Sequence, residues 1–130
     1  MRRFLIAILM MAAAVTVSRA ALAADAAPYT TERFLAAQAA GGPIIVEIHA
    51  SWCPVCAKQK PVLSGLRDTE FKDLAAFAID FDTQKELVKL FGANAQSTLI
   101  VYRGSIEKGR SVGVSDPAAL KALVQKAYAP

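Results

Sequence analysis

The feature that most constrains the fold is a run of β-branched residues that leads directly into two closely spaced cysteines. Residues 44–49 read Ile-Ile-Val-Glu-Ile-His and are apolar on both faces except at Glu47 and His49. A strand that is apolar on both faces belongs at the centre of a sheet covered by helices. The segment Cys-Pro-Val-Cys follows at residues 53–56, and the pattern is helical from there to about residue 67. The sequence therefore predicts a buried strand that delivers two thiols to the start of a helix.

The rest of the chain alternates helix and strand patterns and then ends in a hairpin and a helix. Thr30 or Thr31 is expected to cap a helix before the central strand, and Asp116 to cap a last helix that begins at Pro117. Further elements are expected at residues 74–81 (strand), 84–91 (helix), 98–102 (strand) and 106–114 (strand). This order, α-β-α-β-α-β-β-α, indicates a single α/β domain.

The first 23 residues have the layout of a secretory signal peptide. Arg2 and Arg3 form a positive n-region, residues 4–17 are almost wholly apolar, and residues 21–23 read Ala-Leu-Ala, as at a cleavage site. A retained membrane anchor is the alternative, but this apolar run is shorter than the roughly 20 residues that span a bilayer. We therefore expect cleavage after residue 23 and a folded domain over residues 24–130.

Cleavage would remove most of the excess positive charge. The whole chain has 15 basic and 11 acidic residues, a net charge of +4. Without Arg2, Arg3 and Arg19 the basic residues fall from 15 to 12 while the acidic ones stay at 11, so the net charge becomes +1. The remaining sequence has no basic stripe and no cluster of aromatic and arginine residues, which argues against a nucleic-acid partner.

The spacing of the two cysteines suits reversible disulfide chemistry. Cys53 and Cys56 lie one turn apart on one face of a helix, with Cα atoms about 5–6 Å apart, which a disulfide can bridge. The partial positive charge of a helix N-terminus favours a thiolate at Cys53, the expected nucleophile. Cys56, one turn deeper, would resolve the mixed disulfide.

Two other uses of the cysteine pair stay open at this point. A structural disulfide would suit an oxidising compartment, although the loop it closes is too small to give much entropic stabilisation. The pair could also be half of a structural zinc site. Such a site needs four ligands, however, and the chain has two cysteines and a single histidine.

The segment from residue 45 to residue 56, with Trp directly before the first cysteine, resembles the strand-to-helix active site of the thioredoxin family. Pro61, five residues after the second cysteine, is similar to the helix-kinking proline of that family. Residues 98–102 and 112–113 resemble its last two strands, so the similarity covers roughly residues 30–128. The resemblance implies a thioredoxin fold, in which helices flank a central mixed β-sheet, and no cofactor.

The resemblance also assigns a role to Glu47, which stands where the family has a buried acid beneath the second cysteine. Burial should raise the pKa of Glu47 until it can accept a proton from Cys56; the alternative is a strand glutamate that reaches solvent. The family's lysine on the next strand is replaced by Ala78, so we expect the acid to lack that basic neighbour. His49 could stabilise a Cys53 thiolate, pair with Glu47 or simply pack as a neutral side chain.

Four residues are expected to contact substrate. Trp52 would flank the disulfide as part of a docking surface, and Pro54 and Val55 lie between the cysteines. Ser97 stands where the family has a cis-proline. Either the Gln96–Ser97 peptide bond is trans and the loop is reshaped, or packing enforces a cis bond that costs about 2.5–4 kcal/mol. Serine also supplies an N–H and a hydroxyl that could contact a substrate backbone, a water or a cysteine sulfur.

These observations predict a periplasmic thiol–disulfide oxidoreductase that exchanges disulfides with client proteins. We expect a monomeric reductase that holds no metal and is supplied with electrons by a membrane donor. A disulfide-forming oxidant is one alternative. The other is a non-catalytic carrier of copper or another soft metal, with Cys53, Cys56 and His49 as ligands.

Overall fold

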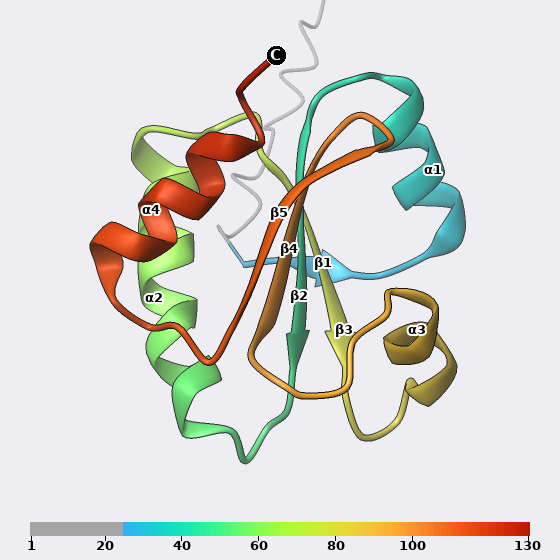
Figure 1. Ribbon diagram of the computed structural model, residues 1–130, viewed down its shortest axis with the longest axis vertical. Helices are drawn as coiled ribbons and strands as arrows, with labels where there is room; N and C mark the ends of the chain where they lie inside the picture. The colour runs from blue at the N-terminus through green and yellow to red at the C-terminus, as the bar shows by residue number, and fades with distance from the viewer. Residues whose placement is uncertain (1–24) are drawn as a thin grey trace, which may run out of the picture.

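The computed structural model describes residues 25–130, in which helices cover both faces of a five-stranded mixed sheet (Figure 1). The predicted signal peptide, residues 1–23, lies outside the described residues. The elements in chain order are β1 (Ala27–Pro28), α1 (Thr31–Ala39), β2 (Pro43–His49), α2 (Pro54–Thr69), β3 (Ala75–Asp80), α3 (Lys85–Leu90), β4 (Thr98–Arg103), β5 (Ile106–Val112) and α4 (Pro117–Lys126).

The order of elements predicted from the sequence is confirmed, with one addition. The two-residue strand β1 pairs in parallel with β3 and was not predicted, because so short a segment carries no periodic pattern. The strand order is β1-β3-β2-β4-β5, so the strand that is apolar on both faces, β2, lies at the centre as expected. It runs parallel to β3 and antiparallel to β4, which makes the sheet mixed.

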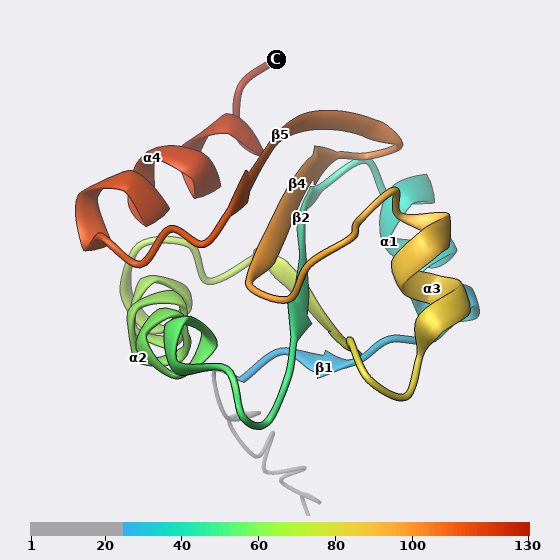
Figure 2. The ribbon, with the colours of Figure 1, turned by 60° about the horizontal axis from the view of Figure 1, so that its bottom comes forward.

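The alternation of side chains along β2 divides the core into two layers. Ile44, Val46 and Ile48 face α1 and α3, where they pack with an aromatic cluster that includes Phe34 and Phe77. Ile45 faces the opposite layer, formed by α2 and α4. Figure 2 shows these two pairs of helices on opposite faces of the sheet. Because Glu47 and His49 share the face of Ile45, both point toward the layer that contains the dithiol helix.

The helix ends follow the local sequence. The Thr30 hydroxyl accepts a hydrogen bond from the Arg33 N–H at 3.3 Å and caps α1. The Asp116 carboxylate accepts one from the Ala119 N–H at 2.9 Å and caps α4, which begins at Pro117 as predicted. None of the helices within residues 25–130 is both long enough and apolar enough to cross a lipid bilayer.

Candidate active site

The two cysteines are joined in a disulfide at the start of α2. Cys53 is the N-cap residue, Pro54 occupies the first turn, and the Cα atoms of Cys53 and Cys56 are 5.3 Å apart. The Cys53 Sγ accepts a hydrogen bond from the Cys56 N–H at 3.1 Å. In the reduced protein the same N–H and the positive end of α2 would stabilise a thiolate at Cys53. Pro54 is exposed and Val55 is half-buried beside the pair.

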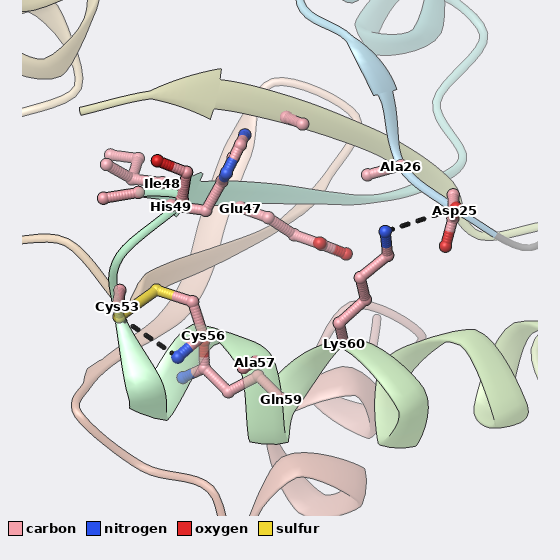
Figure 3. A pocket seen from close by; sticks show the side chains of 13 residues that line it. Asp25, Ala26, Glu47, Ile48, His49, Cys53, Cys56, Ala57, Gln59 and Lys60 are labelled. Carbon is pink, nitrogen blue, oxygen red and sulfur yellow. Dashed lines mark hydrogen bonds and ion pairs between the residues drawn. A yellow bond between two sulfur atoms is a disulfide. The ribbon is translucent and has the colours of Figure 1, made fainter. Parts of the chain in front are cut away.

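A pocket of about 420 Å³ opens next to the disulfide, between α2, the C-terminal part of β2 and Ala78 of β3. Figure 3 shows the disulfide reaching it from α2 and the Glu47 side chain reaching it from β2. Cys53 is only 3% exposed, whereas Cys56 is half-buried. Lys60 and Asp25 form an exposed ion pair at the rim, with 3.5 Å between Nζ and Oδ2. The pocket therefore gives solvent a route to both the second cysteine and the acid.

Glu47 is buried, as predicted, and its carboxylate is held by an ion pair. Arg67 Nη1 donates to Glu47 Oε1 at 2.6 Å, and the two side chains are 7% and 14% exposed, respectively. Burial raises the pKa of Glu47 above its ordinary value, and the adjacent Arg67 guanidinium offsets part of that rise. A carboxyl group with a raised pKa therefore lines the same pocket as Cys56.

The basic neighbour of Glu47 comes from a different element than the family resemblance implied. Ala78 is the partner of Glu47 in the β2–β3 register, so β3 supplies no charge there, as expected. A basic neighbour that the sequence did not reveal takes the place of that lysine, because Arg67 reaches Glu47 from the last turn of α2. The effect of a positive charge on Glu47 depends on its distance from the carboxylate and not on its position in the sequence, so a residue on another element can supply that charge.

The face of α2 that carries Cys56 also carries two buried polar residues that sequence reasoning missed. Gln59, Leu63 and Arg67 follow Cys56 at spacings of three and four residues, and all three are buried. Such spacing places side chains on one face of a helix. The sequence signal that could have revealed Gln59 and Arg67 is a polar residue at a position of α2 whose spacing from Cys56 predicts burial.

His49 lies on the same face of β2 as Glu47 and also lines the pocket. It is close enough to offset a small part of the rise in the pKa of Glu47 and to add to the lowering of the pKa of Asp80. Within residues 25–130, no three His, Cys, Asp or Glu side chains are grouped so that they could hold a metal ion.

Trp52 is 59% exposed beside the disulfide, and its indole is fixed by a hydrogen bond. Its Nε1 donates to Asp82 Oδ2 at 2.7 Å. Asp82 lies in a turn organised by Asp80, whose Oδ1 accepts from the Asp82 N–H at 2.9 Å and from the Thr83 N–H at 2.8 Å. Those bonds lower the pKa of Asp80. The turn after β3 therefore orients the aromatic surface next to Cys53.

The Ser97 loop takes the first of the two conformations considered from the sequence. Every peptide bond in residues 25–130 is trans, and Ser97 adopts a left-handed backbone with φ of 57°. For a residue with a Cβ this conformation costs about 1–2 kcal/mol. Ser97 is buried, and its carbonyl accepts from the Gln59 side chain at 3.3 Å and from the Gly113 N–H at 3.1 Å. These contacts anchor a loop that has no proline.

The comparison with protein families decides the relationship. The family model described as Thioredoxin matches residues 26–126. The chain belongs to the thioredoxin family.

Similar members come from distant organisms. The thioredoxin of Chlamydia muridarum is 32% identical over 87 residues, which cover 67% of this chain and 84% of that protein. A thioredoxin of Aspergillus fumigatus is 33% identical over 91 residues, 67% of this chain and 83% of that protein. The crystal structure of Trxlp from Edwardsiella tarda has a TM-score of 0.72 and 41% identity, and the match covers 75% of this chain and 97% of that one.

Family membership confirms the predicted thioredoxin fold and gives the cysteine pair its activity. A disulfide at the start of α2 in a thioredoxin-family protein makes this chain a thiol–disulfide oxidoreductase. Protein thiols and disulfides are the substrates of this family.

Proposed function

We propose that this thioredoxin-family protein is a periplasmic reductase of disulfides in client proteins. The observation that carries the proposal is the position of Glu47, a buried carboxyl group with a raised pKa that shares a pocket with Cys56. A base at this point assists release of the Cys56 thiolate, which completes the reduction of a client.

The first step of the proposed reaction takes place at Cys53. Its thiolate attacks one sulfur of the client disulfide, a mixed disulfide forms, and the other client sulfur leaves as a thiolate. The Cys56 N–H, already within 3.1 Å of Cys53 Sγ, and the N-terminus of α2 stabilise the attacking thiolate. Trp52, Pro54, Val55 and Ser97 are the proposed client-contacting residues.

The second step uses Cys56 and Glu47. Cys56 gives its proton to Glu47, and its thiolate attacks the Cys53 sulfur of the mixed disulfide. The bond between Cys53 and the client sulfur breaks, the client leaves as a thiolate, and the Cys53–Cys56 disulfide forms. Two electrons have then passed from the dithiol to the client, and Glu47 returns its proton to water through the pocket.

Location and electron supply follow from the same proposal. The signal-peptide pattern of residues 1–23 supports export. Each turnover leaves the protein oxidised, so a reductase in an oxidising compartment needs a dithiol donor, which we place in the membrane. An oxidant would run the same steps in reverse, so the potential of the cysteine pair separates the two directions. The alternative of a metal carrier has less support, because residues 25–130 contain no group of three His, Cys, Asp or Glu side chains that could hold a metal ion.

The reduction potential of the Cys53–Cys56 pair, measured by equilibration with glutathione buffers, tests the proposal. We expect a value close to the roughly −270 mV of thioredoxin, together with reduction of insulin disulfides. A value near the roughly −120 mV of a strong oxidant would contradict the reductase direction. Cys53→Ser should abolish exchange, and Cys56→Ser should accumulate the mixed disulfide, so the pair of variants controls for the order of the two steps.

A further inference from the structure

Gln59 is a buried side-chain amide that the exchange reaction leaves without a role. It lies on α2 one turn after Cys56, is 4% exposed and lines the same pocket. The cost of burying an amide is recovered only when its polar atoms find partners. The partners of Gln59 therefore indicate what it does.

Both hydrogen bonds from the Gln59 amide go to backbone carbonyls of other segments. Nε2 donates to the Val114 carbonyl at 2.7 Å and to the Ser97 carbonyl at 3.3 Å. Ser97 directly precedes β4, and Val114 lies between β5 and α4. Figure 1 shows both segments at the end of the sheet where α2 begins. A single amide thus joins the dithiol helix to two segments that are 38 and 55 residues away.

The Ser97 and Val114 segments both turn through a residue with a left-handed backbone, which is costly only at Ser97. Ser97 has a left-handed backbone that a residue with a Cβ rarely adopts, and Gly113 next to Val114 has φ of 72°. The Gly113 N–H donates to the Ser97 carbonyl at 3.1 Å, so the segments are also tied to each other. Because Gln59 donates to that same carbonyl, it fixes the linked pair relative to α2.

We propose that Gln59 is a positioning residue that holds the Ser97 and Val114 segments against the dithiol helix for recognition of an extended client chain. The inference rests on the proposed function, since it takes the client to be a protein. An extended chain is recognised along its backbone and therefore depends on where these segments lie. A small disulfide needs only access to the Cys53 sulfur and does not depend on them.

The test compares two substrates in single-turnover reactions of the reduced protein. Gln59→Met keeps the length of the side chain and removes both donors. We expect the concentration of insulin that gives the half-maximal rate to rise about tenfold, since the Val114 carbonyl loses its bond from Gln59 and the Ser97 carbonyl keeps only the bond from the Gly113 N–H. The maximal rate with insulin and the rate constant with hydroxyethyl disulfide should both stay within about twofold. Gln125→Met, the same change at an exposed position of α4, should alter neither substrate.

Amide hydrogen exchange provides a second readout. Exchange of the Gly113 N–H should be faster in Gln59→Met, because the bond to the Ser97 carbonyl loses its support. If circular dichroism shows that this variant is unfolded, Gln59→Asn, which keeps the amide but shortens its reach, is measured by the same criteria.

Three results would overturn the inference: equal losses with insulin and hydroxyethyl disulfide, no loss with either, or unchanged exchange at Gly113. Failure of the proposed function looks different. In that case the wild-type protein would react with hydroxyethyl disulfide but not with insulin, before any variant is compared.

Discussion

Replacing Arg67 by methionine tests whether the ion pair on α2 sets the proton affinity of Glu47. The change keeps an apolar chain in the buried stripe of α2 and removes the guanidinium that lies 2.6 Å from the carboxylate. Both side chains are more than four-fifths buried, so solvent screens the pair poorly. Breaking a buried pair by removing one partner costs about 3–5 kcal/mol, because the other charge is left uncompensated.

The loss of stability caused by Arg67→Met should increase with pH, because the pKa of Glu47 is raised in the folded protein. The folded protein holds the Glu47 proton to a higher pH than the unfolded chain, so its stability falls as pH rises through the interval between the two pKa values. Loss of Arg67 raises the folded pKa further and widens this interval. The variant should therefore lose about 3–5 kcal/mol near pH 7 and only about 1–2 kcal/mol near pH 4, where Glu47 is protonated.

Urea unfolding of the oxidised protein at both pH values measures the difference. The double variant Arg67→Met with Glu47→Gln controls for packing, because it removes the uncompensated charge and should recover most of the stability lost near pH 7. Adding Ala78→Lys to Arg67→Met should also restore stability, since Ala78 is opposite Glu47 in the strand register. A loss that is the same at both pH values and insensitive to either second change would refute the electrostatic reasoning.

Two further changes address the surface around the disulfide. Ser97→Pro should destabilise the protein by about 2 kcal/mol in urea unfolding, because proline fixes φ near −65° and Ser97 has φ of 57°; equal or greater stability would show that the loop can take up another conformation. Trp52→Ala should raise the half-saturating concentration of insulin about tenfold. It should change stability by no more than about 0.5 kcal/mol because the indole is largely exposed, so a large loss of stability would show that Trp52 mainly supports the fold.

The parts of the fold that the sequence predicted depend on short-range patterns. The β2 run is apolar on both faces because the strand lies between two layers of helices, and that property is visible in six consecutive residues. Thr30 and Asp116 cap their helices through bonds to N–H groups three residues later. The cysteine pair is also local, since one helical turn sets the distance that a disulfide requires.

The contacts that the sequence did not predict join residues that lie far apart in the chain. Arg67 and Glu47 are 20 residues apart, and Gln59 and Val114 are 55 apart. Which residues contact Gln59 and Arg67 depends on which face of α2 packs on the sheet and on where the loops before β4 and after β5 lie. Ser97 marked a departure from the family, but its left-handed backbone depends on partners from α2 and from the segment after β5.

The origin of the charge beside Glu47 also bears on how such proteins diverge. A cation can approach Glu47 either from position 67 on α2 or from position 78 on β3. A basic residue is therefore needed at one of these two positions and not at both. A lineage could then exchange one arrangement for the other through an intermediate that carries both basic residues and loses neither function nor stability. Among exported relatives, we expect basic residues at these two positions to alternate, so that either alone is poorly conserved while their combination is retained.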